Sequence, residues 1–190
     1  QRQMCIRDSC MIEHIPDMID AGINSFKVEG RMKTALYVAV VTRTYREAID
    51  DYYTSKELYE SKMKHYREEI AACTFRQFTT GFYYGKPNEE TQIYDCNTYV
   101  KNRVYLGTVE EVTVAGELVI HQKNKFCVGD AIEVMAFDGE NVDVEVLAIH
   151  DEHGTEMESA PHPKQLLCVK VSNSEKIRKG MIIRTRHCAV

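Results

Sequence analysis

The stretch Phe26–Thr34, FKVEGRMKT, decides the fold of the first half of the chain. Apolar and charged residues alternate here, which predicts a strand over residues 23–29 followed by a glycine turn and a helix. A parallel strand buried on both faces is normally apolar throughout, so charges at its end need a partner or a function. The carboxyl ends of strands carry the active sites of β/α proteins. Lys27, Glu29 and Arg31 are therefore candidate catalytic residues, with a buried structural ion network as the alternative.

Helical periodicity surrounds this stretch on both sides. Apolar residues repeat at helical spacing over residues 12–19, where Pro16 suits a first turn and Gly22 suits the stop. An apolar stripe from Met32 to Tyr52 predicts a long helix, and a charged, tyrosine-rich helix follows over residues 56–72. One β/α unit cannot bury its own strand. We therefore expect an α/β region that is the carboxyl-terminal end of a TIM-type barrel, in a fragment of a longer protein.

The second half of the chain changes to short β runs separated by polar turns. The turns include Ala115-Gly116 and Asp138-Gly139, which suit hairpins. Alternation and these turns predict six strands, over residues 104–114, 117–121, 131–136, 142–149, 166–171 and 181–185. Such a run predicts an all-β region that closes into a small β-barrel, because closure leaves no exposed sheet edge.

The changes of pattern divide the chain into four regions. Residues 1–9 show neither helical nor strand periodicity and no capping or turn pattern, and we interpret them as a non-native leader. Residues 10–55 are the expected end of the TIM-type barrel, and residues 56–96 form a helical and aromatic linker region. Residues 97–190 are the expected small β-barrel domain.

Composition and charge restrict the classes of partner. The chain is 44% hydrophobic and 28% charged, as is usual for a globular protein. Its net charge of −5 argues against a broad nucleic-acid surface, so we expect no DNA partner and RNA contact only through a local patch. No apolar run is long enough to span a membrane, and no signal-peptide core is present. Seven scattered cysteines without a C-x-x-C pair indicate reduced thiols and a cytoplasmic protein.

Three parts of the sequence resemble the peptidase U32 family, whose members are often described as collagenase-like. They are IEHIPDMIDAGINSFKVEGRMKTALYVAVVTRTYREAID (12–50), TFRQFTTGFYYGKP (74–87), and QKNKFCVGDAIEV (122–134) with APHPKQ (160–165). The third part is similar to the carboxyl-terminal β domain of the family. The resemblance implies a (β/α)₈-type barrel whose last strand covers residues 23–29, with Glu29 and Arg31 at its catalytic face.

The resemblance also implies a chemistry. Family members are described as collagen-degrading peptidases, whereas others hydroxylate nucleobases in tRNA or ribosomal RNA, or act in ubiquinone hydroxylation, with an iron–sulfur cluster on four cysteines. Cys10 resembles the last of these four ligands. We therefore expect the full-length protein to take part in iron–sulfur-dependent tRNA uridine hydroxylation, and this chain alone to be inactive. A collagenase-like peptidase with a protein substrate is the alternative, as is an RNA- or protein-binding β-barrel module for the fragment.

Three weaker signals come from a histidine, an aromatic segment and a basic cluster. His14 follows Cys10 by four residues, but no second pair completes a zinc site, so it is better interpreted as a helix-start histidine. The aromatic residues around Arg76 suit base stacking, although packing between the two regions explains them better. The basic residues near the carboxyl end suit either a solvated face or contact with an RNA backbone: Lys176, Arg178, Lys179, Arg184 and Arg186.

Overall fold

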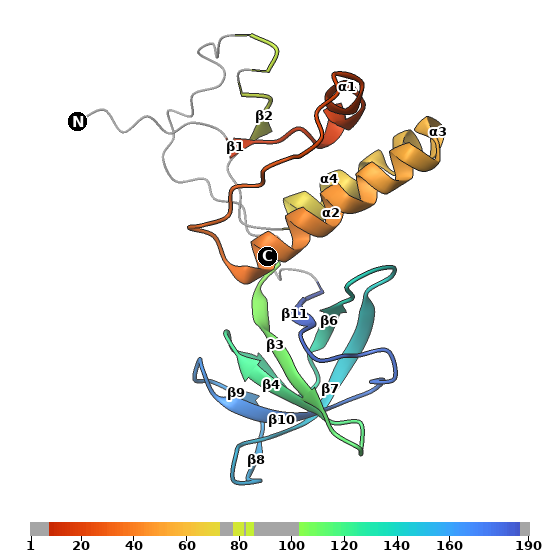
Figure 1. Cartoon of the computed structure of the whole chain (residues 1–190). Helices are drawn as coiled ribbons and strands as arrows, with labels where there is room; N and C mark the ends of the chain where they lie inside the picture. Colours follow the sequence, from red (N-terminus) through yellow and green to blue (C-terminus); the bar gives the residue numbers. More distant parts are fainter. Residues whose placement is uncertain (1–7, 73–77, 82, 86–102, 187–190) are drawn as a thin grey trace, which may run out of the picture. The chain divides into compact units, whose positions relative to one another are not determined.

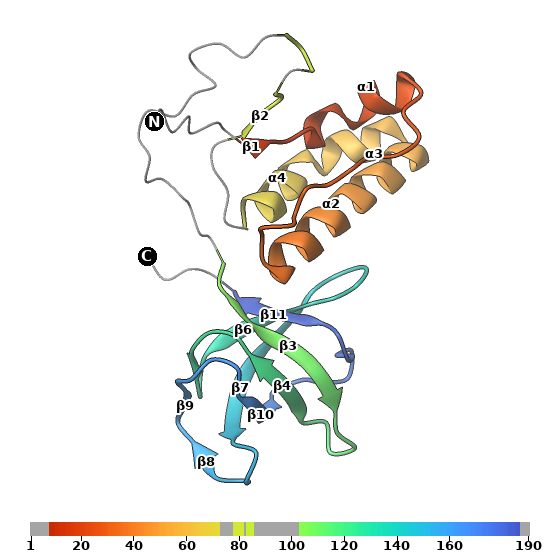
Figure 2. The ribbon, with the colours of Figure 1, turned by 60° about the vertical axis from the view of Figure 1, so that its left-hand side comes forward.

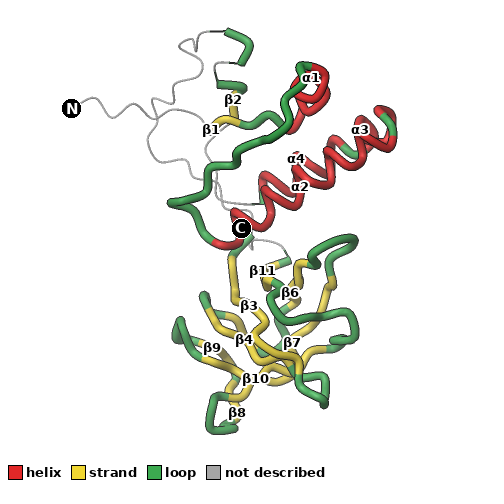
Figure 3. Tube along the Cα trace, in the orientation of Figure 1, coloured by secondary structure: helices red, strands yellow, loops and turns green. Residues whose placement is uncertain are grey.

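The computed structural model describes residues 8–72, 78–81, 83–85 and 103–186 of the chain (Figure 1). The chain forms two compact units that meet in sequence between Asn102 and Arg103. The first unit is helical, and the second is built from β-strands (Figure 3). Each unit has a hydrophobic core of its own.

The first unit contains a short 3-10 helix and four α-helices. Their bounds are Ile12–His14 for the 3-10 helix, Ile15–Asp20 for α1, Ala35–Thr54 for α2, Lys56–Ser61 for α3 and Met63–Ala71 for α4. Thr34 caps α2, because its hydroxyl accepts the backbone N–H of Tyr37 at 3.2 Å. Ser55 caps α3 in the same way through Leu58, at 3.0 Å. These helices confirm the predicted periodicity, and Lys62 divides the last predicted helix into α3 and α4.

The core of the helical unit lies between α1, α2 and the α3–α4 pair. Its fully buried side chains include Ile15, Ala48 and Tyr66, each 0% exposed. Two short strands, β1 (Asp8–Ser9) and β2 (Phe78–Thr79), pair in parallel at one side of the unit. Within the described ranges, no helix is long and apolar enough to cross a membrane.

The strand predicted over residues 23–29 is not formed. The segment lies outside the helices and strands, and it returns beside α2 toward that helix's amino-terminal end (Figure 2). A parallel strand needs hydrogen-bonding neighbours, and none of the described strands pairs with this segment. The side chains predicted to lie on a covered strand face are consequently exposed. The broader prediction, a first region with helices at the end of a TIM-type barrel followed by a small β-barrel, is confirmed as a helical region followed by an antiparallel β-barrel.

The second unit is a closed six-stranded antiparallel barrel. Its strands are β3 (Tyr105–Val112), β4 (Leu118–Gln122), β6 (Ala131–Met135), β7 (Val142–His150), β10 (Leu166–Val171) and β11 (Ile182–Thr185). They follow the order β10-β4-β3-β11-β6-β7, and the pairing of β7 with β10 closes the barrel. Short strands β5 (Phe126–Cys127) and β9 (Ser159–Ala160) pair with each other, and β8 (Glu156–Met157) pairs antiparallel with the end of β7. All six predicted strands are therefore confirmed.

The barrel interior is filled by alternate apolar side chains of these strands. Val109, Leu118 and Ile120 are 0% exposed and belong to one continuous core. Gly107 lets β3 and β4 approach closely, because a Cβ atom there would lie 2.7 Å from Ile120 Cγ2. The predicted hairpin turn at Gly116 is also confirmed, since that residue has φ +79°.

Candidate functional site: a pocket beside Cys10

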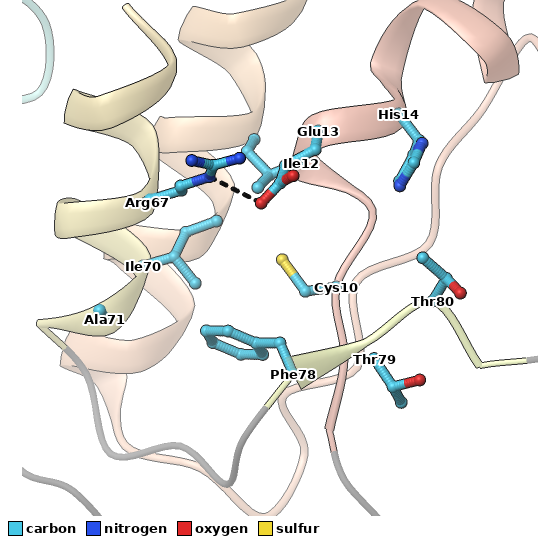
Figure 4. Close-up of a pocket in the computed structure, with 10 residues that line it drawn as sticks. All are labelled: Cys10, Ile12, Glu13, His14, Arg67, Ile70, Ala71, Phe78, Thr79 and Thr80. Carbon is cyan, nitrogen blue, oxygen red and sulfur yellow. Dashed lines mark hydrogen bonds and ion pairs between the residues drawn. The ribbon is translucent and has the colours of Figure 1, made fainter. Parts of the chain in front are cut away.

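A pocket of about 340 Å³ lies between the Cys10 segment, α4 and β2 in the helical unit. Its apolar wall consists of Ile12, Ile70, Ala71 and Phe78. Its polar lining consists of Cys10, Glu13, His14, Arg67, Thr79 and Thr80. In Figure 4 the Cys10 thiol points into the space between Ile70, Phe78 and the Glu13–Arg67 pair. The pocket thus has an apolar wall, a thiol that points into it and charged groups at its rim.

Backbone hydrogen bonds hold the Cys10 segment in place. The Cys10 N–H donates to the carbonyl of Thr79 at 2.9 Å, next to the β1–β2 pairing. From the opposite side, the Tyr45 hydroxyl accepts the N–H of Met11 at 2.8 Å. The same hydroxyl lies 3.6 Å from Cys10 Sγ. The direction of the thiol is therefore fixed by α2 and β2 together.

A stack of tyrosines supports the segment from α3 and α4. The Tyr59 hydroxyl donates to the carbonyl of Ile12 at 2.7 Å. The rings of Tyr59 and Tyr66 stack with their centroids 5.9 Å apart, and the Tyr66 hydroxyl donates to Asp51 Oδ2 at 2.6 Å. Tyr59 and Tyr66 are almost fully buried. Because every one of these hydroxyls has a partner, the polar atoms can be buried at little cost.

Burial of these tyrosines predicts that the helical unit loses stability in alkali. Burial raises the pKa of Tyr59 to about 12, whereas an unfolded tyrosine titrates near pH 10. Burial also raises the pKa values of Tyr45 and Tyr66. Below pH 10 folded and unfolded chains both keep these protons, so the stabilisation is complete there. Above pH 10 the unfolded chain loses protons first, and stability falls as the pH approaches 12.

Circular dichroism at 222 nm between pH 8 and pH 12, together with tyrosine ionisation at 295 nm, measures this effect. We expect the helical signal to fall in the same interval in which the buried tyrosines ionise. Ionisation of every tyrosine near pH 10 with an unchanged helical signal would contradict it.

The Cys10 thiol is protonated in this environment. Burial raises the pKa of the thiol, and the partial compensation by hydrogen bonds from Ile12 and Tyr45 does not reverse the shift. A thiol ligates metal as the thiolate, so a bound cation would have to supply the charge that stabilises that form. The environment of Cys10 therefore favours the unreactive, protonated thiol over the reactive thiolate.

The described residues do not form a complete metal site by themselves. No group of three or more His, Cys, Asp or Glu side chains that could hold a metal ion occurs among them. An iron–sulfur cluster needs about four thiolates, and Cys10 is the one cysteine among the residues that line this pocket. The other free cysteines that the structure describes, Cys127 and Cys168, belong to the β-barrel unit. The pocket therefore fits one ligand of such a cluster and not the whole set.

The polar rim of the pocket is an ion pair between Glu13 and Arg67. Arg67 Nε donates to Glu13 Oε1 at 2.7 Å, across 54 residues of sequence. This hydrogen bond lowers the pKa of the Glu13 carboxyl, which stays ionised at neutral pH. Both side chains are about half exposed, so the pair contributes little to stability. Its importance lies in presenting a carboxylate and a guanidinium side by side at the pocket.

His14 belongs to a second polar cluster at the rim. It is the N-cap residue of α1, which confirms its interpretation as a helix-start histidine. Its Nδ1 atom lies 3.3 Å from Asp17 Oδ2 and 3.0 Å from the Tyr84 hydroxyl. The Tyr84 hydroxyl in turn donates to Asp17, and this bond lowers the pKa of the Asp17 carboxyl. The cluster fixes the orientation of the imidazole beside the pocket.

The three charged residues singled out in the sequence lie away from this pocket. Lys27, Glu29 and Arg31 are all exposed, and none of them lines the pocket. Glu29 Oε1 accepts the backbone N–H of Arg31 at 2.9 Å, which closes a local turn. The alternative of a buried ion network is therefore wrong for this structure, whereas a catalytic role for the three residues stays a prediction.

The basic cluster near the carboxyl end is divided by burial. Four of its residues are exposed: Lys176, Arg178, Lys179 and Arg186. Arg184 is 0% exposed, and its guanidinium donates to the carboxylate of Glu133. Arg184 is thus not part of an exposed basic face, because its charge is already paired. Arg76, the other predicted RNA contact, lies outside the described residues.

Sequence reasoning missed most of the pocket. Glu13, Arg67 and Phe78 come from three separate elements, and no motif connects them. The resemblance that pointed to Cys10, the histidine four residues after it and the aromatic residues around Arg76, which include Phe78, were the signals that lead to this place in the fold. Contacts over such separations depend on how the helices pack, which local patterns do not specify.

Fold and pocket together define a protein with a pocket-bearing helical region followed by a closed antiparallel β-barrel. The sequence model described as Peptidase family U32 matches residues 2–93, and the model of its C-terminal domain matches residues 101–184. The chain therefore belongs to the peptidase U32 family.

Relatives of the chain include tRNA hydroxylation proteins and collagenases. The chain is 35% identical over 182 residues to tRNA hydroxylation protein P1 of Bacillus subtilis, which covers 93% of the chain and 43% of that protein. It is 26% identical to tRNA hydroxylation protein P of Escherichia coli, over 94% of the chain and 38% of that protein. It is also 35% identical to a collagenase of Porphyromonas gingivalis, over 62% of the chain and 35% of that protein. The chain thus spans less than half the length of these relatives.

A solved structure of a family domain is also similar. The C-terminal domain of a Geobacillus thermoleovorans protein assigned to the U32 peptidases is 28% identical, with a TM-score of 0.40. The match covers 43% of this chain and 99% of that domain.

Proposed function

We propose that the full-length protein takes part in the hydroxylation of uridine in tRNA. The observation that carries the proposal is the 35% identity to a tRNA hydroxylation protein, which extends over 93% of this chain and therefore over both units. The pocket beside Cys10 has the features of a small-molecule site, because it is concave, partly apolar and rimmed by a few polar groups. Because the chain spans 43% of that relative, we expect the 190 residues alone to show no turnover.

Cys10 is proposed as one ligand of an iron–sulfur cluster in the full-length protein. Its thiol points into the pocket, and its backbone is fixed by hydrogen bonds on two sides. Such fixed orientation is what a metal ligand requires. The remaining thiolates would have to come from outside the described residues.

Lys27, Glu29 and Arg31 are proposed to orient the substrate. All three are exposed, so they are accessible to a substrate or to a small carboxylate. Arg31 suits a carboxylate, because its guanidinium can donate two parallel hydrogen bonds. RNA-backbone contact is proposed for Arg76 and for the four exposed basic residues of the barrel unit: Lys176, Arg178, Lys179 and Arg186.

Nucleoside mass spectrometry of tRNA and ribosomal RNA, with and without the full-length gene, tests the proposed function. We expect a hydroxylated uridine to disappear from tRNA when the gene is deleted, and to return with the wild-type gene. If both residues act in the chemistry, we expect the Cys10→Ala gene to restore no hydroxylated uridine. The Glu29→Gln gene should restore at least about tenfold less of it than the wild-type gene. Gln keeps the size of Glu29 and removes its charge, so this variant separates charge from shape.

Unchanged RNA in the deletion strain would contradict the proposal. The relatives described as collagenases make a peptidase the next hypothesis in that case. Cleavage of an unfolded protein substrate that is lost in Glu29→Gln would then support it.

A further inference from the structure

We infer that Tyr45 is a positioning residue for the Cys10 sulfur, which its hydroxyl group reaches from α2. The hydroxyl holds the segment through the N–H of Met11 and donates its own proton to Cys10 Sγ. This inference rests on the proposed function for the role of Cys10 as a cluster ligand. It gives α2 a part in the site, which the apolar stripe of that helix did not predict.

The Tyr45 hydroxyl has one acceptor within reach for its own proton. In the described part of the chain it makes hydrogen-bond contacts with two atoms, the backbone nitrogen of Met11 at 2.8 Å and Cys10 Sγ at 3.6 Å. The N–H of Met11 can only donate, so the oxygen must accept there and its own proton has to point elsewhere. Burial raises the pKa of Tyr45, so the hydroxyl keeps that proton. A half-buried O–H group gains by donating, and the sulfur is the acceptor available to it.

Packed or paired neighbours on both sides fix the distance between the hydroxyl and the sulfur. Tyr45 lies in the middle of α2, flanked by Thr44 and Ala48, which are 1% and 0% exposed. On the other side, the N–H of Cys10 donates to the carbonyl of Thr79 in β2 at 2.9 Å. Both groups are thus held in place by their surroundings, as a preorganised site requires.

A second donor, the backbone N–H of Ile12, also faces the sulfur. A neutral thiol is a weak acceptor and needs neither donor, whereas a thiolate is stabilised by both. Two donors at one sulfur therefore match a metal-bound cysteine, which has lost its proton. Because burial still raises the pKa of the free thiol, the donors suit the ligated state of Cys10 and not its protonated state.

Donors at a ligand sulfur change the chemistry of a cluster. A bound cluster would supply one-electron transfer, and hydrogen bonds to its sulfurs help to set the reduction potential. Reduction adds negative charge, so a hydrogen bond to the sulfur stabilises the reduced form more than the oxidised form. Tyr45 is therefore expected to raise the reduction potential, and it acts on the reaction through Cys10.

Tyr59 provides a matched comparison, because its hydroxyl has a purely structural contact. It donates to the carbonyl of Ile12 at 2.7 Å, so it anchors the same segment. No hydrogen bond between Tyr59 and Cys10 occurs among the described residues. Loss of the Tyr59 hydroxyl should therefore loosen the segment without removing a donor from the sulfur.

Redox titration of the purified full-length protein, followed through the electron paramagnetic resonance signal of its cluster, tests the inference. We expect Tyr45→Phe to lower the ratio of reduced to oxidised cluster about tenfold at a fixed potential, which is about 59 mV for one electron. Tyr59→Phe should leave this ratio unchanged. Iron analysis of each variant shows whether the cluster is retained.

Replacement of Tyr45 by 3-fluorotyrosine should give the opposite change in almost the same volume. Fluorine makes the phenol a stronger hydrogen-bond donor, so we expect the reduction potential to rise. A residue that only fills space or anchors Met11 would not shift the potential in opposite directions with the two replacements. This replacement also decides the matter if Tyr45→Phe loses its cluster.

An unchanged potential with either replacement of Tyr45, an equal shift in Tyr59→Phe, or a full-length protein without a cluster would overturn the inference. The tRNA function fails in a different experiment, the nucleoside analysis of the deletion strain. Loss of hydroxylated uridine together with an unchanged potential would leave the function standing and remove the role of Tyr45. A shifted potential with unchanged cellular RNA would do the opposite.

Discussion

Replacement of Glu133 by alanine is expected to lower the free energy of unfolding of the β-barrel unit by about 3–5 kcal/mol. Glu133 lies in β6 and is 8% exposed. It accepts a hydrogen bond from the fully buried guanidinium of Arg184 and another from Arg103 Nη1 at 2.7 Å. The substitution removes the carboxylate that both guanidinium groups contact, while the Arg184 charge stays buried. Removal of one partner of a buried pair costs far more than the pair contributes to stability.

Urea unfolding followed through the amide signals of β6 and β11 measures this loss without interference from the helical unit. Glu133→Gln keeps an acceptor and removes the charge, so its loss should be smaller. Glu145→Ala is the matched control, because Glu145 is exposed on the neighbouring strand β7 and should change stability by less than about 0.5 kcal/mol. A loss below about 1 kcal/mol in Glu133→Ala would show that the Arg184 charge is solvated or paired otherwise.

The burial of Arg184 shows where sequence patterns fail in the barrel. The six strands were predictable, because each is defined by local alternation and by its turns. Strict alternation after the buried Ile183 would place Arg184 outside, together with the other basic residues. The pairing of β11 with β6 places Arg184 opposite Glu133, whose carboxylate accepts a hydrogen bond from the buried guanidinium. Such a contact depends on the partner strand, so the sequence of β11 alone does not reveal it.

The helical unit shows a different limit. Its helices were predictable from apolar spacing and from capping residues such as Ser55. The strand over residues 23–29 was not, because strand pairing is a property of two segments and this one has no described partner. The pocket was not predictable for the same reason, since Glu13 and Arg67 meet only after α4 packs against the 3-10 helix that carries Glu13. What the sequence lacks in both cases is information about distant neighbours.

Replacement of Tyr66 by alanine is expected to lower the free energy of unfolding of the helical unit by about 3–5 kcal/mol. The pocket is lost when this unit unfolds. The Tyr66 ring is 0% exposed and stacks on Tyr59, whose hydroxyl holds the carbonyl of Ile12. The loss of this ring leaves a cavity under the segment that carries Cys10. It also loosens α4, which positions Arg67.

Tyr66→Phe separates packing from hydrogen bonding in this stack. It removes only the bond to Asp51, which keeps an ion pair with Lys62 at 2.8 Å, so we expect a loss of about 1.5 kcal/mol. Urea unfolding followed through the amide signals of α2 and α4 measures both variants, with the exposed Tyr53→Ala as a control that should change little. Equal losses in Tyr66→Ala and Tyr66→Phe would assign the stabilisation to the hydroxyl. The expected difference between them would instead make ring packing the physical basis on which the pocket, and any ligand bound in it, depends.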